Sequence, residues 1–338
     1  MTKYRLDTNM YPLRYEVTDQ VCTCAQGKVR LGLCCINNTL RKKNIFCSRT
    51  CTRKTFSVEK AKQLSVKNCE DILTILQWNE HHNIKHFRLS SDLFPHYTDT
   101  EVPTYDMPLE SLQALHKAGQ FANQHNHRIT MHPSQHNVVG TPRQRVFDMT
   151  VKDLSKHADI LDAMDVNEDG VLCVHGGGVY GDKEATMRRW IEQFDDLPSK
   201  VKRRLAIENC EKSYSVEDCL YLANECKIPM ILDTHHYACY QLFHPDEPQP
   251  ELEELMPFVL DSWKHRTPLF HISDPACTTS NSMGCCNHHD YVQSIPSCLL
   301  EIPWLYDQSI DIEVEAKAKE AAIFCLYDKY KNIFTCSQ

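Results

Sequence analysis

Residues 230–236 read MILDTHH, and this stretch contains the pattern from which the fold can be inferred. Apolar residues suited to a buried strand run straight into an acid and two histidines, which are costly to bury. Short runs rich in Val, Ile and Leu recur eight times, and the last six end in His, Asp or Glu. The runs are VRLGLCC from Val29, KHFRLSS from Lys85, RITMHP from Arg128, VLCVHG from Val171, RLAIENC from Arg204, PMILDTHH from Pro229, PLFHIS from Pro268 and SIDIEVEA from Ser309.

Longer amphipathic segments separate most of these runs, notably residues 57–82, 109–127, 144–164 and 216–226. Eight β/α alternations without a glycine-rich dinucleotide turn favour an α/β fold of the (β/α)₈ TIM-barrel type over a doubly wound sheet. The seventh unit is the least regular, because residues 285–304 mix loop and helix signals. No linker divides the chain. We therefore expect a single barrel domain over residues 29–338, preceded by an N-terminal extension, residues 1–28, over the barrel floor.

Composition sets broad limits on the class of protein. The chain has 338 residues, of which 42% are hydrophobic and 24% charged, as in globular proteins with a sizeable core. A net charge of −8 does not indicate nucleic-acid binding for the chain as a whole. It does not exclude such binding, because the charge on the binding face is what matters. The sequence shows no signal peptide or membrane span, so we expect an intracellular monomer; cytoplasm, nucleus and virus particle are not distinguished.

Eighteen cysteines are unusual for a chain of this length. The pairs Cys22/Cys24 and Cys47/Cys51 could hold a structural zinc ion, but their spacing differs from the usual two-residue knuckle. Reduced, free thiols are the better interpretation in an intracellular protein.

The polar residues at the ends of the predicted strands are expected to lie close together. In a barrel the carboxyl ends of all strands meet on one face, where active sites of this fold are built. A single histidine there is more often a hydrogen-bonded core residue, but a carboxylate among apolar residues needs a cation or a shifted pKa. Together they predict a site for zinc or manganese and argue against calcium. The candidate ligands are His132, His175, Glu208, Asp233, His236, His271 and Glu315.

A basic loop follows the first predicted strand. Residues 40–56 contain no acid and six cations: Arg41, Lys42, Lys43, Arg49, Arg53 and Lys54. A charge run is usually a solvated surface. This loop, however, rises on the face that carries the metal ligands, which favours a polyanionic substrate, nucleic acid being the obvious candidate.

The motifs together resemble the UV damage endonucleases, a family of metal-dependent TIM-barrel DNA repair enzymes; endonuclease IV is more distantly similar. The resemblance runs from Val29 to Leu326, and the order and spacing of its motifs are far more specific than any one of them. They are RLGLCCIN, FRLSSDLFP, MHPSQHNVV, LCVHGGGVYGDK, LAIENCEKSYS, PMILDTHH, FHISDP, HHDYV and DIEVEAKAKEAA.

The resemblance implies three divalent ions, mostly manganese, with magnesium or zinc as substitutes. His132 and His175 would hold one ion, with Glu208 as the bridge to a second. Asp233, His271 and Glu315 would complete the second site. His236 and His288 would hold the third ion, with His289 as the competing choice. Among these residues, Glu208, His236 and Glu315 are expected to be catalytic.

The resemblance also implies contacts with DNA. Asn37 matches a polar residue that contacts the damaged strand, and Gln135 and His136 match the pair that probes the duplex opposite the lesion. Arg41, Lys42 and Lys43 are expected to bind the backbone. Two positions depart from the family: Leu33 stands where a tyrosine is frequent, and Leu269 where a modified lysine is reported. Lesion preference and the surroundings of the third ion are the properties these departures affect.

The implied activity is a nick in double-stranded DNA immediately 5′ of a UV photoproduct, and also at abasic sites. The products would carry a 3′-hydroxyl and a 5′-phosphate, and ATP would not be needed. Two alternatives stay open. The first is a xylose-isomerase-like sugar isomerase or epimerase, because these enzymes use similar acid/histidine metal sites. The second is a non-catalytic, metal-dependent DNA-binding protein, which would not need an open metal position that activates water.

Overall fold

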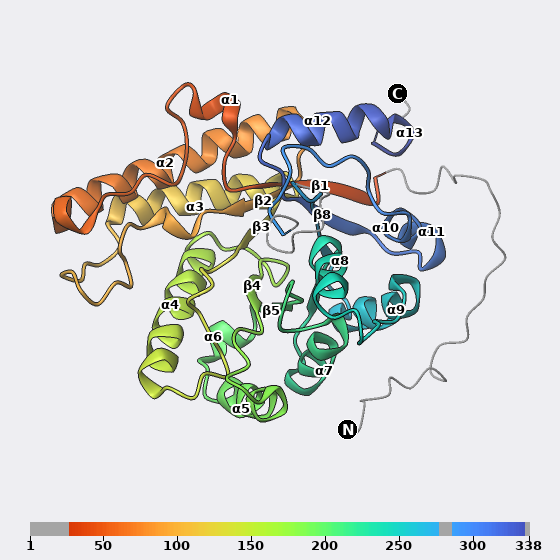
Figure 1. The fold of residues 1–338 in the computed structure, drawn as a ribbon. Coiled ribbons are helices and arrows are strands. Elements are labelled where there is room, and N and C mark those ends of the chain that lie inside the picture. Colours follow the sequence, from red (N-terminus) through yellow and green to blue (C-terminus); the bar gives the residue numbers. More distant parts are fainter. Residues whose placement is uncertain (1–26, 277–285, 335–338) are drawn as a thin grey trace.

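The computed structural model describes residues 27–276 and 286–334, and its centre is a closed barrel of eight parallel strands (Figure 1). Each strand pairs with its neighbours in sequence, and β8 pairs with β1. The predicted TIM barrel is confirmed, and each of the eight predicted runs contains one strand. The strands are β1 (Val29–Cys34), β2 (His86–Leu89), β3 (Arg128–Met131), β4 (Leu172–His175), β5 (Leu205–Glu208), β6 (Met230–Asp233), β7 (Leu269–Ile272) and β8 (Ile310–Val314).

Helices surround the barrel on its outer side (Figure 1). The four amphipathic segments predicted from the sequence correspond to α2, α3, α4 and α7. In the described part of the irregular seventh unit, the helices are the short α10 and α11. The helices are α1 (Asn38–Arg41), α2 (Val58–His81), α3 (Leu109–Gln124), α4 (Gln144–Ala163), α5 (Lys183–Asp195), α6 (Ser199–Lys202), α7 (Val216–Cys226), α8 (Thr234–Phe243), α9 (Leu252–Trp263), α10 (Ser297–Leu300), α11 (Ile302–Leu305), α12 (Glu320–Lys329) and α13 (Lys331–Phe334), with 3₁₀ turns η3 (Arg53–Thr55) and η4 (Ser91–Leu93).

The stretch MILDTHH is half strand and half helix. β6 ends at Asp233, and α8 begins at Thr234 without an intervening loop. The Asp233 side chain caps the helix, since its Oδ1 accepts a hydrogen bond from the His236 backbone N–H at 2.8 Å. His236 therefore lies in the first turn of a helix, where the sequence pattern had indicated the end of a strand.

The strand register brings candidate ligands side by side. His175 of β4 is the partner of Glu208 in β5, and Asp233 of β6 is the partner of His271 in β7. Side chains alternate across a strand, so partners in register point to the same side of the sheet. Here that side is the barrel interior.

The barrel interior is divided into two chemically different halves. On β4–β7 a small apolar cluster contains Val171, Cys173, Ala206, Ile231 and Leu269, closed by Trp263. On β8 and β1–β3 the interior is charged: Arg128 of β3 reaches Asp311 of β8 at 3.0 Å, across the two strands between them.

A glycine makes room for one member of the charged half. A Cβ atom at Gly32 of β1 would lie 2.3 Å from His86 Nδ1, so only glycine leaves the space that the buried His86 ring fills. Most large apolar side chains belong instead to the main core between strands and helices, among them Phe87 of β2 and Trp190 of α5.

Two expectations concern the ends of the chain and membranes. Apart from Gly27 and Lys28, the expected N-terminal extension lies outside the described residues. Among the described residues, no helix is both long enough and apolar enough to cross a membrane.

Candidate metal centre

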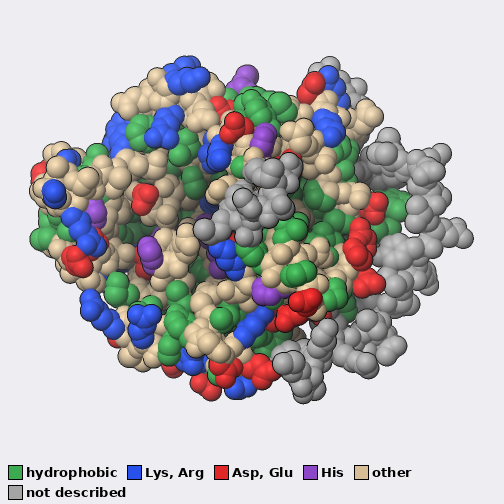
Figure 2. Space-filling model, viewed as in Figure 1, with side chains coloured by type: hydrophobic (Ala, Val, Ile, Leu, Met, Phe, Trp, Pro, Cys, Tyr) green, Lys and Arg blue, Asp and Glu red, His purple; other side chains and the backbone are tan. Residues whose placement is uncertain are grey.

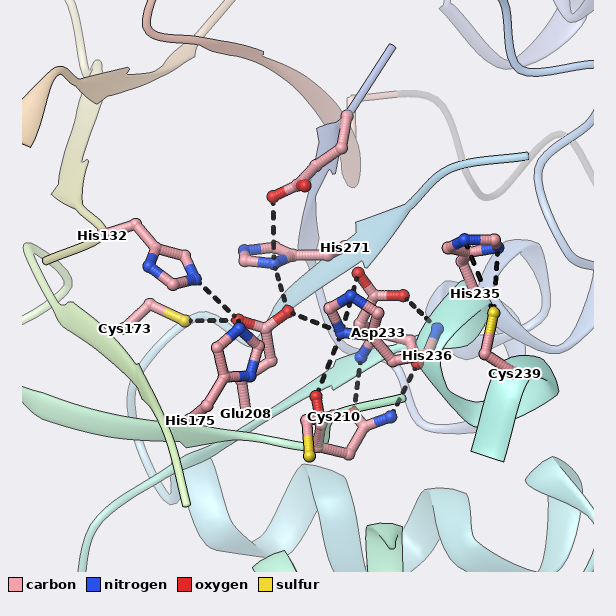
Figure 3. A network of polar contacts seen from close by, with 12 residues as sticks. His132, Cys173, His175, Glu208, Cys210, Asp233, His235, His236, Cys239 and His271 are labelled. Atoms are coloured by element: carbon pink, nitrogen blue, oxygen red, sulfur yellow. Dashed lines mark hydrogen bonds and ion pairs between the residues drawn. The ribbon is translucent and has the colours of Figure 1, made fainter. Parts of the chain in front are cut away.

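Glu208 lies at the middle of the candidate site and is 1% exposed. Its two carboxylate oxygens face different histidines (Figure 3). Oε2 is 3.1 Å from His132 Nε2 and 3.7 Å from His175 Nε2. Oε1 is 3.0 Å from His271 Nδ1 and 3.4 Å from His236 Nδ1. One carboxylate therefore joins two pairs of imidazoles, as a ligand that bridges two ions must.

Asp233 and His236 extend this group along α8. Asp233 is fully buried, and its Oδ2 is 3.6 Å from His236 Nδ1. The same His236 nitrogen lies 3.1 Å from the carbonyl oxygen of Asn209. Because Asp233 also caps the helix, its side chain fixes the position of His236 twice, through the backbone and through the ring.

Glu315 follows β8 directly and closes the site from the opposite side. Its Oε1 is 3.6 Å from His271 Nδ1, and its Oε2 is 3.4 Å from His288 Nδ1. The Arg88 guanidinium lies between Glu315 and the buried Glu313, 2.5 Å and 2.6 Å from their carboxylates. Arg88 thus holds both acids of β8 in place from β2.

The electrostatics show that these carboxylates and imidazoles stabilise one another. Burial alone would raise the pKa of Glu208, but His271 and His175 lower it well below its ordinary value. Burial opposes protonation of His271, yet Glu208 and Glu313 raise its pKa to about 9. Despite burial, Asp233 and Glu208 raise the pKa of His236 well above its ordinary value. The carboxylates therefore favour positive charge at His271 and His236, which a bound divalent cation would supply in place of the protons.

The residues present fit divalent cations. Three of the clusters whose ligand atoms all lie within 4.8 Å of one another include Glu208: with His132 and Cys173, with His175 and His236, and with Asp233 and His271. Within residues 27–276 and 286–334, no hydrogen-bond partner reaches the buried atom Asp233 Oδ2. Buried polar atoms are normally paired, so this orphaned acceptor beside His236 fits a ligand of a cation.

The structure brings most of the predicted ligands into one group, and the pair predicted for a third ion has different neighbours. The His236 ring lies against His175, with ring centroids 5.4 Å apart. His288 lies instead against Glu315 and against His235, whose ring centroid is 5.7 Å away. His289, the competing choice, accepts a hydrogen bond on its Nδ1 from the Tyr291 backbone N–H at 3.1 Å.

Three residues of the site were missed by the sequence analysis. The Cys173 thiol donates to Glu208 Oε2 at 2.8 Å, and Glu313 and Arg88 hold the β8 side. The alternation in DIEVE contains a usable signal, because a period of two puts Asp311, Glu313 and Glu315 on one face of β8. Nothing in the sequence around Cys173 distinguishes it from an ordinary buried cysteine.

The basic loop is only partly free to bind a ligand. Arg49 pairs with Asp71, and Arg53 pairs with Asp99 and Glu101. Three further cations at the end of α1 are exposed, and no ion pair joins them to any other residue in the described part of the chain: Arg41, Lys42 and Lys43. In Figure 2, Lys and Arg side chains gather over the edge of the molecule that α1 occupies in Figure 1.

The loop after β3 carries the two predicted probe residues on its surface. Gln135 and His136 are exposed, and they border different hollows. Gln135 lines a cavity of about 270 Å³ that also contains His175, and His136 lines one of about 560 Å³. Asn137 anchors the loop, because its Nδ2 donates to Asp153 Oδ2 of α4 at 2.7 Å.

Asn37 lies inside the protein, and so do Leu33 and Leu269, the two positions that depart from the family pattern. Asn37 is 1% exposed, and its side-chain oxygen accepts a hydrogen bond from the Leu40 N–H at 2.8 Å, which caps α1. Leu33 is fully buried in the core around β1, and Leu269 belongs to the apolar half of the barrel interior.

Comparisons with known proteins identify the relatives of this chain. The UV-damage endonuclease of Schizosaccharomyces pombe is 37% identical over 318 residues, which cover 89% of this chain and 51% of that protein. The chain thus spans about half the length of this relative. The crystal structure of SacUVDE is 26% identical and superimposes with a TM-score of 0.76, covering 90% of this chain and 99% of that one.

A more distant structure shares the fold. Endonuclease IV from Thermus thermophilus has a TM-score of 0.53 at 12% identity, covering 87% of this chain and 95% of that one, which is a likeness of fold alone. The model of the family described as UV-endonuclease UvdE matches residues 29–338, nearly the whole chain. The chain belongs to the UV-endonuclease UvdE family.

Proposed function

We propose that this chain nicks double-stranded DNA immediately 5′ of UV photoproducts, and at abasic sites, without ATP. The products carry a 3′-hydroxyl and a 5′-phosphate. One observation carries the proposal: the buried Glu208 carboxylate turns its two oxygens to different pairs of histidines, the arrangement needed to hold neighbouring cations at one phosphate. The exposed cations of α1 follow β1 on the same face.

The donor set supports three divalent ions, of which manganese is the proposed native metal and magnesium or zinc are substitutes. His132 and His175 would hold one ion, with Glu208 shared with the second. Asp233, His271 and Glu315 would complete the second site, and His236 with His288 would hold the third. Divalent cations in such sites neutralise the oxygens of the scissile phosphate and lower the pKa of an attacking water.

The protein side chains prepare these positions. Glu208, His236 and Glu315 are the proposed catalytic residues. His236 is oriented by Asp233, through the helix cap and the ring contact. Arg88 restrains Glu315, so the carboxylate is held in place before substrate arrives.

DNA is held by residues outside the metal centre. Arg41, Lys42 and Lys43 neutralise backbone phosphates, and Gln135 and His136 occupy the gap left by flipped bases. UV-damaged dinucleotides are poorly stacked, so extruding them costs less than extruding intact bases. Asn37 contacts the damaged strand only if its Nδ2, which has no hydrogen-bond partner among the described residues, becomes accessible.

A nicking assay on supercoiled plasmid tests the function. Irradiated and intact plasmid are compared with manganese and with chelator. Nicks confined to irradiated plasmid with manganese are expected, and end mapping on a defined photodimer duplex should place the cut directly 5′ of the lesion. Binding without nicking would favour the DNA-binding alternative. Failure of both binding and nicking would favour the sugar isomerase alternative.

We propose that the protein acts inside the cell and as a monomer. Sedimentation of the protein with and without a photodimer duplex tests the monomer: one chain per duplex is expected, and a dimer in either state contradicts it.

A further inference from the structure

A buried thiol lies inside the candidate metal centre, next to the carboxylate that joins its histidines. Cys173 is on β4, two residues before His175, and is 2% exposed. Its Sγ donates to Glu208 Oε2 at 2.8 Å, and the same oxygen lies 3.1 Å from His132 Nε2. Figure 3 shows Cys173 and His132 approaching the Glu208 carboxylate from the same side. A thiol and an imidazole therefore share one carboxylate oxygen.

These three side chains form a group that could hold a single ion. The ligand atoms of His132, Cys173 and Glu208 all lie within 4.8 Å of one another. His175 Nε2, 3.7 Å from the same Glu208 oxygen, brings a fourth donor to this position. Oxygen, nitrogen and sulfur donors on one tetrahedral zinc ion are about 3.3–3.6 Å apart. The shorter separation of the thiol from Glu208 is that of a hydrogen bond, and it would widen to about 3.5 Å once an ion replaced the thiol proton.

A second thiol–carboxylate pair in the same barrel shows what the Glu208 pair lacks. Cys34, the last residue of β1, donates its thiol to the buried Glu313 at 3.0 Å. There the Arg88 guanidinium, 2.6 Å from Glu313, supplies a permanent positive charge. Within the part of the chain that the structure describes, the ion pairs of Glu208 are all with histidines and none is with Lys or Arg. A buried carboxylate needs a compensating charge, so the Cys173 pair has a place for a cation that the Cys34 pair does not.

We propose that Cys173 is a ligand of the ion held by His132 and Glu208, and that its thiolate makes this one position select zinc. His175 would be the fourth donor. The inference rests on the proposed metal-dependent function and refines it, because manganese would then occupy only the positions with oxygen and nitrogen donors. Thiolate favours zinc, whereas manganese binds more weakly than the other divalent transition metals and prefers oxygen. Four protein donors fill the shell of a tetrahedral ion, as in sites that fix structure rather than activate water.

Cobalt substitution tests the ligand without measuring endonuclease activity. Co²⁺ bound by a thiolate has an intense charge-transfer absorption in the near ultraviolet, which Co²⁺ bound only by nitrogen and oxygen lacks. The difference spectrum between the wild-type protein and Cys173→Ser, both reduced and loaded with Co²⁺, should contain this band. Serine can still donate a hydrogen bond to Glu208, so this variant separates a ligand from a hydrogen-bond donor. His132→Ala should weaken the same band, because the ion loses an imidazole, and Cys34→Ala is the matched control that should keep it.

Metal competition measures the selectivity of the position. After loading with equal concentrations of Zn²⁺ and Mn²⁺ and removal of free metal, the wild-type protein should retain about one zinc ion more per chain than Cys173→Ser or Cys173→Ala. Circular dichroism confirms that each variant is folded. Cys34→Ala should retain as much zinc as the wild-type protein.

Three results would each overturn the proposal. They are a difference spectrum without the thiolate band, a zinc content that is the same in Cys173→Ser and the wild-type protein, and an equal loss of the band in Cys34→Ala. None of these measurements involves DNA. A protein that nicks irradiated plasmid with manganese but lacks the band therefore contradicts this inference alone, and a protein that has the band but does not nick contradicts the proposed function alone.

Discussion

The two halves of the barrel interior differ in chemistry and in what they carry above them. Strands β4–β7 enclose the apolar cluster around Leu269 and end in ligands such as Glu208 and His271. Strands β8 and β1–β3 enclose ion pairs around Asp311 and lead to the basic and probe loops. Glu315, directly after β8, and His132, directly after β3, lie at the two borders between the halves.

The difference indicates a division of labour. The apolar cluster on β4–β7 lowers the local dielectric beneath the charged ligands at the ends of these strands. The lower dielectric strengthens their interaction with cations and with one another. The acids inside the half made of β8 and β1–β3 do not depend on a low dielectric in this way, because they are already paired with arginines. Chemistry is therefore expected to depend on the β4–β7 half, and DNA affinity on the half made of β8 and β1–β3.

The largest expected effect comes from Glu208→Gln, at the top of the apolar half. Loss of the bridging charge should reduce nicking by more than about 100-fold, since even residues behind metal ligands are worth about 10- to 100-fold. Affinity for DNA should change little. The measurements are nicking rate, metal content and DNA binding, with Glu225→Gln on the exposed face of α7 as the control. A full metal complement with wild-type nicking would contradict the bridging role.

Asp311→Asn tests the charged half. Asp311 is fully buried and accepts from Arg30 Nε at 2.6 Å and from Arg128 Nη1 at 3.0 Å. Removing one member of a buried ion pair costs about 3–5 kcal/mol, which urea denaturation measures. Asp307→Asn, at an exposed pair with Lys28, is the control and should stay near wild type.

The same variant has a predicted pH dependence. Burial would raise the pKa of Asp311, but Arg30 and Arg128 lower it below its ordinary value. A lowered folded pKa contributes stability above the unfolded value, near pH 4, which is lost as the pH falls through the folded pKa. Wild-type protein should therefore lose stability in acid more steeply than Asp311→Asn. Parallel acid profiles would show that Asp311 is not the group responsible.

Leu269→Ala is the corresponding change in the apolar half. Leu269 is fully buried beside Ala206 and Ile231, so truncation leaves a cavity and should cost about 3 kcal/mol in urea denaturation. No ionisable group is removed, so the cost should be the same at pH 7 and pH 5. A cost that changes with pH would mean that the two halves are coupled rather than independent.

The sequence predicted the strands and the face that carries the candidate ligands better than the contacts between those ligands. Strands were recognisable because short apolar runs with polar ends are distinctive, and the barrel fold then placed His271, Glu208 and Asp233 on one face. The register that makes His175 the partner of Glu208 has no local signal. It depends on pairing between segments that are far apart in the sequence.

The residues missed or placed differently have physical explanations. Arg88 was overlooked because an arginine after a phenylalanine in a strand reads as solvent-facing, and only barrel closure brings it to Glu313. His236 was assigned to a strand end because the helix cap at Asp233 depends on geometry rather than on composition. Asn37 was selected through family resemblance, and its side chain caps α1.

A smaller effect is expected at the probe loop, above the charged half. Gln135→Ala/His136→Ala should reduce the preference for photodimer over intact duplex on the order of tenfold, since base stacking contributes about 1–3 kcal/mol per base. Metal content should not change, because neither residue is a proposed ligand. Ser134→Ala, on the same exposed loop, is the control. An unchanged preference argues against probing, and a loss of metal would show that the loop supports the centre instead.

The smallest expected effect concerns the exposed cations of α1. Neutralising Arg41, Lys42 and Lys43 to glutamine should weaken binding to damaged and intact DNA alike, because phosphate contacts carry no sequence or lesion information. The slope of log affinity against log salt should become shallower by about one unit for each phosphate that is no longer neutralised. Arg53→Gln is the matched control on the same loop, since Arg53 is already paired with Asp99 and Glu101 and should not alter the slope. The rate of nicking at saturating DNA should stay at the wild-type value, because none of these residues is a proposed metal ligand or catalytic residue. If the rate fell while the slope stayed constant, the basic loop would act on the chemistry, and the assignment of binding to one half of the barrel and chemistry to the other would be wrong.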